Sequence, residues 1–178
     1  MKSLATIWSI IEASRSMPAM ILVTSATPDD DAIGVAQGLV NASKNAGHCT
    51  GFLALGGAFD AHAPAASLAL PDESSCAGFD ELLHTWRATY DVIIVEIPQL
   101  LTHNLGAHVA RTADGVIVAV RTNRSVQLAD RELSALLKQL GAALLGVVAT
   151  PPVVIGIVGD ALTRSLRARR SFPVPAAS

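Results

Sequence analysis

The sequence is poor in aromatic residues and in cysteine. Its 178 residues include one Tyr, two Trp, four Phe and two Cys. The cysteines, Cys49 and Cys76, form no Cys-x-x-Cys pair and share no Cys/His metal spacing, so we expect two free thiols in a reducing compartment. Lys and Arg number 13 against 15 Asp and Glu, and this balance offers no electrostatic reason to expect a nucleic-acid partner.

A signal peptide and a membrane span are also not expected. Residues 1–20 contain Lys2, Glu12 and Arg15 and no unbroken apolar core, unlike a secretory signal. The longest apolar stretch, residues 142–159, approaches the length of a membrane span, but two prolines at 151 and 152 would break a helix there. We therefore expect a buried strand, a turn and a second apolar segment, in a cytoplasmic protein without a transmembrane segment.

The residues that are abundant are small aliphatic ones, arranged in apolar runs that alternate with amphipathic segments. This alternation predicts an α/β fold with a mainly parallel sheet flanked by helices. The predicted strands cover residues 20–25, 52–55, 91–97, 116–121 and 144–149. The predicted helices cover residues 4–15, 29–46, 79–88, 101–111, 126–140 and 160–170, with a long loop over 56–75. We expect one domain over residues 1–170 and a flexible tail over 171–178.

Ligands of such a sheet bind beyond the carboxyl ends of its strands. Here several pieces that lead to those ends resemble one known family. Residues 21–28 are similar to the strand that enters a Walker A loop, residues 90–98 to a Walker B strand, and residues 113–121 and 145–148 to the two following strands. In this order they resemble the cytoplasmic P-loop ATPase domain of bacterial tyrosine kinases of capsule and exopolysaccharide export, which is related to partition and division-site ATPases. The resemblance covers residues 20–149 and implies a P-loop NTPase-like fold of the SIMIBI class.

The sequence differs from that family at the glycine, lysine and hydroxyl positions of the phosphate loop. Where the family has Gly-Glu-Gly-Lys-Ser-Thr after the proline, this chain has Asp-Asp-Asp-Ala-Ile-Gly. The lysine position is Ala32 and the magnesium hydroxyl position is Ile33. Two charges about 4 Å apart interact by about 4 kcal/mol at an effective dielectric near 20, so an acid here would repel a triphosphate. The affected positions are Asp29, Asp30, Asp31, Ala32 and Ile33.

The three aspartates also have a purely structural interpretation. Asp29 or Asp30 is a plausible N-cap of the following helix, and an aspartate there satisfies free backbone N–H groups. Magnesium or calcium binding by the triplet is less favoured, because three consecutive side chains at a helix start diverge.

Other positions of the family's nucleotide site have changed as well. The Asp-x-Asp at the end of the second strand is absent from residues 53–56, and the base-contacting Asn falls near Thr150. The Walker B aspartate is replaced by Glu96, which is either a structural acceptor or a remaining metal ligand. Tyr90 is the only tyrosine, so the C-terminal tyrosine cluster of the kinases is missing too.

These departures, set against the resemblance, predict a non-catalytic pseudo-ATPase or pseudokinase scaffold with no cofactor, no metal and no catalytic residue. Its expected role is regulatory, in bacterial exopolysaccharide synthesis or export. One alternative is a degenerate partition or positioning ATPase that acts in subcellular localisation. Another is an unorthodox metal-dependent phosphohydrolase that uses Glu96.

The resemblance also suggests where partners would bind. We expect a protein partner, either a membrane polysaccharide co-polymerase that recruits the chain to the inner membrane or an active paralogue. The family's Glu-x-x-Arg-x-x-Arg subunit-packing pattern is met by Glu12 and Arg15, but Pro18 stands in the third place, and a homo-oligomer stays open. Arg164 and Arg167 belong to a basic segment that either touches an acidic or anionic surface or is solvated.

Overall fold

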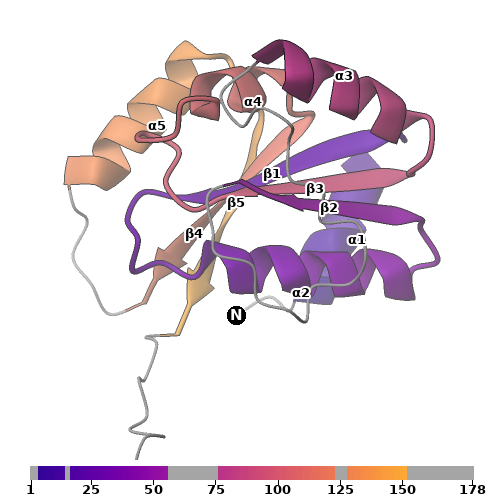
Figure 1. The fold of residues 1–178 in the computed structure, drawn as a ribbon. Coiled ribbons are helices and arrows are strands. Elements are labelled where there is room, and N and C mark those ends of the chain that lie inside the picture. Colours follow the sequence, from indigo (N-terminus) through magenta and orange to yellow (C-terminus); the bar gives the residue numbers. More distant parts are fainter. Residues whose placement is uncertain (1–3, 15–16, 56–75, 123–127, 152–178) are drawn as a thin grey trace, which may run out of the picture.

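The chain folds into a five-stranded parallel sheet between two layers of helices (Figure 1). The structure is a computed structural model, and it describes residues 4–14, 17–55, 76–122 and 128–151. The strands are β1 (Ala19–Ser25), β2 (Thr50–Ala54), β3 (Val92–Ile97), β4 (Gly115–Arg121) and β5 (Leu144–Thr150). The helices are α1 (Leu4–Ser14), α2 (Ala32–Asn45), α3 (Cys76–Arg87), α4 (Gly106–Thr112) and α5 (Leu128–Gln139). The α/β class and the parallel sheet predicted from the sequence are confirmed.

The strands lie in the order β2-β3-β1-β4-β5. Strand β1 is central, and Leu22 pairs with Val95 of β3 on one side and with Val116 of β4 on the other. Every residue of β1 and β3 is buried, which is why these strands show continuous apolar runs instead of an alternating pattern. This topology brings the carboxyl ends of β1, β3 and β4 together at one edge.

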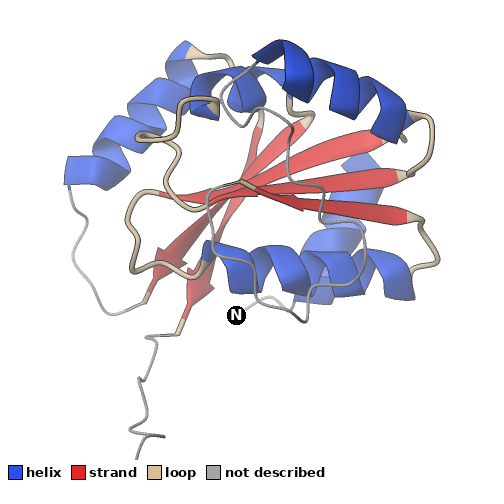
Figure 2. Ribbon diagram, in the orientation of Figure 1, coloured by secondary structure: helices blue, strands red, loops and turns tan. Residues whose placement is uncertain are grey.

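Helices α1 and α2 cover one face of the sheet, and α3, α4 and α5 cover the other (Figure 2). Trp8 and Ile11 of α1 are buried against α2 and the sheet, so this side of α1 serves ordinary packing. The opposite face is filled by Phe79 and Trp86 of α3 and Leu133 of α5, together with α4. Two hydrophobic cores therefore sandwich the sheet.

Two helices begin later than the sequence predicted. Helix α4 starts at Gly106 instead of residue 101, because the chain first turns and packs Leu100 against Gly106. A β-carbon at Gly106 would lie 2.3 Å from the carbonyl oxygen of Leu100, so the approach requires glycine. Helix α2 starts at Ala32 instead of residue 29, because the residues before it form a turn. The predicted segments 160–170 and 171–178 lie outside the described residues.

Candidate functional site at the carboxyl ends of the central strands

The loop between β1 and α2 is tied to the sheet by Asp30. Its carboxylate accepts a hydrogen bond from Thr27 Oγ1 at 2.7 Å through one oxygen and from the backbone N–H of Arg121 at 2.6 Å through the other. The side chain is 5% exposed. An aspartate that the sequence placed in a phosphate loop therefore serves as an internal acceptor that joins this loop to the end of β4.

Asp31 caps helix α2. Its Oδ1 accepts from the backbone N–H of Gly34 at 2.9 Å. The prediction from the sequence that Asp29 or Asp30 is the cap is wrong, because Asp30 turns inward to Thr27 and Arg121 while Asp29 is exposed. A β-carbon at residue 34 would lie 2.2 Å from Asp31 Oδ2, so Gly34 leaves room for the capping carboxylate.

Several backbone N–H groups at the start of α2 already have acceptors within the chain. Ala32 N donates to the carbonyl of Asp30 at 3.0 Å, and Val35 N donates to the carbonyl of Asp31 at 3.3 Å. The bond of Val35 is the ordinary first bond of the helix, whereas the N–H groups of Ala32 and Gly34 would otherwise be available to a bound anion at the helix N-terminus. The side chains of Ala32, which is buried, and Ile33, which is 39% exposed, supply neither a charge nor a hydroxyl.

Glu96 lies at the end of β3 and is 2% exposed. Burial raises the pKa of its carboxyl, and the nearby charge of Asp31 raises it further, to about 7. The side chain therefore holds its proton at a pH where an exposed glutamate has lost it. Within the described ranges, no group of three or more His, Cys, Asp or Glu side chains is arranged to hold a metal ion.

The neighbouring strand ends are joined by contacts that have no local sequence signal. Ser25 Oγ donates to the carbonyl of Pro98 and lies 2.9 Å from that of Thr27, which links the ends of β1 and β3. At the end of β2, the backbone N–H of Leu55 donates to the carbonyl of Glu96 at 2.8 Å. Ala54 and Leu55 bring no carboxylate to this position, as the sequence indicated.

At the far side of the site, β4 and β5 end on adjacent polar residues. Arg121 pairs with Thr150 in the sheet register, and the carbonyl of Thr150 accepts from the N–H and the hydroxyl of Thr122 at 2.8 and 3.0 Å. In the part of the chain that the structure describes, Arg121 Nε and Thr150 Oγ1 are buried without a hydrogen-bond partner. The position that resembled a base-contacting one therefore holds a buried threonine.

Of the residues predicted to contact partners, Glu12 lies within the described part of the chain. Glu12 of α1 pairs with His48, with 2.8 Å between Oε1 and Nε2, and the edge of the His48 ring faces Trp8. This contact joins α1 to the segment before β2. Arg15, Arg164 and Arg167 lie outside the described residues. None of the helices in the described ranges combines the length and the apolar character needed to cross a membrane.

No protein-family model matches the sequence, and no curated protein matches it either. Solved structures do match the fold. The chimerical protein CapA2B2 is 19% identical with a TM-score of 0.67, and the match covers 84% of this chain and 83% of that one. The VpsO kinase domain is 17% identical with a TM-score of 0.64, and the coverage is 83% and 90%. The kinase domain of the Escherichia coli tyrosine kinase ETK is 14% identical with a TM-score of 0.57, and the coverage is 90% and 72%.

These neighbours show that the chain has a P-loop NTPase-like fold and that its structural neighbours include bacterial tyrosine kinase domains. At identities below 20%, the likeness concerns the fold. What happens at the site must be argued from the residues of this chain.

Proposed function

We propose that this protein is a non-catalytic pseudo-ATPase scaffold that binds a protein partner in bacterial exopolysaccharide synthesis or export. The main support for the proposal is that the aspartates of the loop after β1 make hydrogen bonds within the protein itself. Asp30 bonds to Thr27 and to the backbone of Arg121, and Asp31 caps α2. The acceptor groups that a phosphate would provide are supplied by the protein itself.

Electrostatics supports the same conclusion. A functional phosphate loop needs positive charge and free N–H groups, whereas here the loop carries three aspartates and no lysine. A phosphate oxygen about 4 Å from one carboxylate would meet a repulsion of about 4 kcal/mol at an effective dielectric near 20, close to a thousandfold in affinity. We therefore expect the fold to be retained for its surfaces and not for nucleotide chemistry.

The proposed partner is a membrane polysaccharide co-polymerase or an active paralogue. The support is the similarity of the fold to the VpsO and ETK kinase domains. Such a partner would bring the chain to the inner membrane. The alternative function, a degenerate relative of the partition or positioning ATPases, would also be non-catalytic and would differ from the proposed one in its protein partner.

The first test is nucleotide binding. Titration calorimetry with ATP and with ADP, each with magnesium, should detect no binding at micromolar concentrations. A micromolar dissociation constant for either nucleotide would overturn the pseudo-ATPase proposal. The second test is affinity capture from the native host with the intact chain as bait. Capture of polysaccharide export components supports the proposed role, whereas capture of division or partition components supports the alternative function.

One observation favours an enzymatic alternative. The near-neutral pKa of Glu96 is a property found in general bases, although burial together with a nearby like charge also produces it in a group without a catalytic role. If the chain were a metal-dependent phosphohydrolase, Mg²⁺ or Mn²⁺ would support turnover of a nucleotide or phosphoester, and Glu96→Gln would abolish it. The absence of turnover with every such substrate would remove this alternative.

A further inference from the structure

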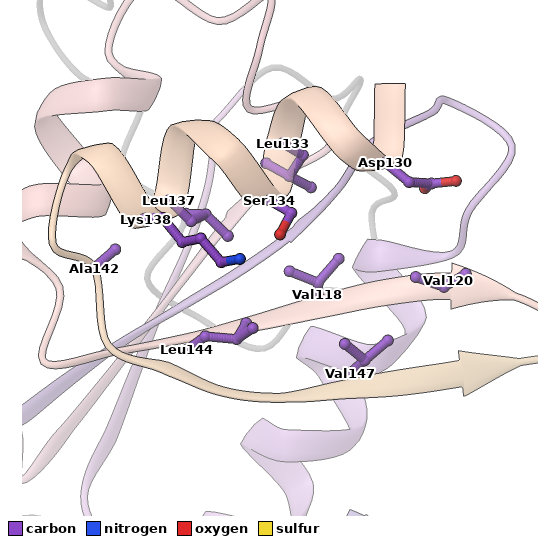
Figure 3. A pocket seen from close by; sticks show the side chains of 10 residues that line it. All are labelled: Val118, Val120, Asp130, Leu133, Ser134, Leu137, Lys138, Ala142, Leu144 and Val147. Carbon is purple, nitrogen blue, oxygen red and sulfur yellow. The ribbon is translucent and has the colours of Figure 1, made fainter. Parts of the chain in front are cut away.

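An apolar groove opens between α5 and the strands β4 and β5 (Figure 3). Its volume is about 250 Å³, and a cavity of about 150 Å³ already holds a benzene molecule. We call it the α5–β5 groove, and its apolar lining consists of Val118, Val120, Leu133, Leu137, Leu144 and Val147. The groove therefore has room for one large apolar side chain from another molecule.

Strand β5 forms the outer wall of this groove and is an edge strand of the sheet in the described part of the chain. Leu144 is 51% exposed and Val147 is 60% exposed, whereas the three middle residues of β2, at the other edge, are buried. Exposed edge strands usually carry charged residues or proline that prevent pairing, and β5 contains neither. This edge is therefore suited to pairing with another extended segment.

The hydrogen bonds between β4 and β5 show which backbone groups of β5 face the open edge. The carbonyl of Thr150 accepts from the N–H of Thr122, on the β4 side. Because successive residues of a strand direct their backbone groups to opposite sides, the N–H and C=O groups of Val147 and Ala149 point away from β4. The side chain of Val147 points toward α5 (Figure 3). A segment paired with β5 would therefore lie directly beside the groove.

The side of α5 that borders the groove carries more positive than negative charge. A second, wider hollow on this side is lined by Asp130, Arg131, Ser134, Ala135 and Lys138, three of which also line the groove. These residues bring two cations and one carboxylate. Figure 3 shows the Lys138 side chain directed into the space between the helix and the strands. An acidic residue next to the bound apolar one would therefore be attracted to this rim.

The same charges argue against a second copy of the chain as the occupant. Two copies joined edge to edge at β5 by a two-fold axis would carry their α5 helices on the same face of one continuous sheet. Arg131 and Lys138 of one copy would then lie beside those of the other. Like charges that meet across an interface cost affinity, so the rim favours an occupant of the opposite charge.

We propose that the outer edge of β5 is where the protein partner binds, by adding an extended segment of its own to the sheet. One apolar side chain of that segment would enter the α5–β5 groove, and an acidic side chain would lie near Arg131 and Lys138. In strand addition the main-chain hydrogen bonds supply affinity and the side-chain pockets supply specificity. The inference rests on the partner-binding part of the function proposed above and names the surface and the chemistry of that partner.

Selection of binders to the intact chain from a phage-displayed library of short random peptides tests the proposal. The enriched peptides should carry apolar residues at alternate positions together with Asp or Glu. Fluorescence anisotropy of labelled synthetic copies measures their affinity, which should fall as salt is added. No enrichment, or enrichment of peptides without this pattern, overturns the proposal.

Two variants locate the bound peptide. Val147→Pro removes an N–H that points to the open edge and should weaken binding about tenfold or more, since proline is tolerated where the N–H faces away from the sheet. Lys138→Glu should weaken binding about fivefold or more. The matched control is Lys44→Glu, the same change in the last turn of α2 on the other face of the sheet, which should leave the affinity within about twofold. Unchanged binding by Val147→Pro, or equal effects of the two lysine changes, overturns the proposal.

Amide exchange followed by NMR keeps the test decisive. In the peptide-free chain the amides of Val147 and Ala149 should exchange faster than that of Val148, and added peptide should slow them. Slow exchange of both in a peptide-free monomer would show that another part of the chain covers β5, and slow exchange only in a dimer would show that a second copy does. Sedimentation separates these two results, and either overturns the proposal.

The fold of each variant and the earlier proposal are checked separately. Amides of β1 report on the global fold, and if Val147→Pro exposes them, Val147→Lys is used instead, because lysine protects natural edge strands without repelling an acidic peptide. Calorimetry with ATP reports on the pseudo-ATPase proposal alone. A chain that binds nucleotide and peptide loses that proposal and keeps this one, whereas a chain that binds neither does the reverse.

Discussion

The Asp30 carboxylate accepts a 2.6 Å hydrogen bond from the backbone amide of Arg121, a residue 91 positions further along the chain. The other oxygen of Asp30 accepts from Thr27 within the same loop. This contact joins the loop after β1 to the end of β4.

Asp30→Ala should lower the free energy of unfolding by about 1–3 kcal/mol, because it leaves the partly buried amide of Arg121 and the buried hydroxyl of Thr27 without this acceptor. Urea denaturation measures the change. Asp29→Ala removes the same charge from an exposed neighbour and should cost less than about 0.5 kcal/mol. Equal effects of the two changes would show that the contact with Arg121 contributes nothing.

Glu96 should make the stability of the protein depend on pH. Its pKa is about 7 in the folded chain and 4.5 in a model peptide, so the folded state holds its proton over a range where the unfolded state has lost it. The stabilising contribution of the neutral carboxyl is fully present below pH 4.5 and is lost as the pH rises through about 7. The loss is up to about 3 kcal/mol.

Glu96→Gln should abolish this component, since glutamine does not titrate, and should raise stability at pH 8 relative to the wild type. Thermal unfolding of both proteins from pH 4.5 to 8 measures this component as the difference between the two stability profiles. Glu81→Gln, at an exposed glutamate of α3, is the control and should leave the pH profile unchanged. A wild-type profile identical to that of Glu96→Gln would contradict the raised pKa.

Asp31 should have two separable effects, because it both caps α2 and places a charge near Glu96. Asp31→Ala removes the cap and should destabilise the protein by about 1 kcal/mol. Asp31→Asn keeps a capping oxygen and removes only the charge, so it should preserve stability at low pH while lowering the pKa of Glu96. Unfolding curves over the same pH range distinguish the two, and a pH profile unaltered by Asp31→Asn would exclude electrostatic coupling.

Helix α1 should be held mainly by apolar packing. Ile11→Ala removes a side chain that is 1% exposed and should cost about 2–4 kcal/mol. Ile33→Ala, at a position that is 39% exposed, is the matched control and should cost less than about 1 kcal/mol. Glu12→Gln, which weakens the half-exposed ion pair with His48, should cost less than about 1 kcal/mol. An effect of Glu12→Gln as large as that of Ile11→Ala would contradict this order.

The sequence determined the elements and their class. The apolar runs of β1 and β3 are long enough to require burial on both faces, and buried parallel strands alternating with helices follow from that requirement. The sequence alone also shows that Ala32 and Ile33 provide neither a lysine nor a hydroxyl at these two positions.

Tertiary structure decided which polar groups meet. The sequence alone does not show that Asp30 faces Arg121 or that Asp31 is the residue that caps α2. It also does not show that Ser25 bonds to the carbonyl of Pro98. These contacts join residues far apart in sequence or depend on which way a side chain turns, and local patterns carry no information on either. Burial by the surrounding strands likewise raises the pKa of Glu96, because desolvation depends on what the fold places around a carboxyl group.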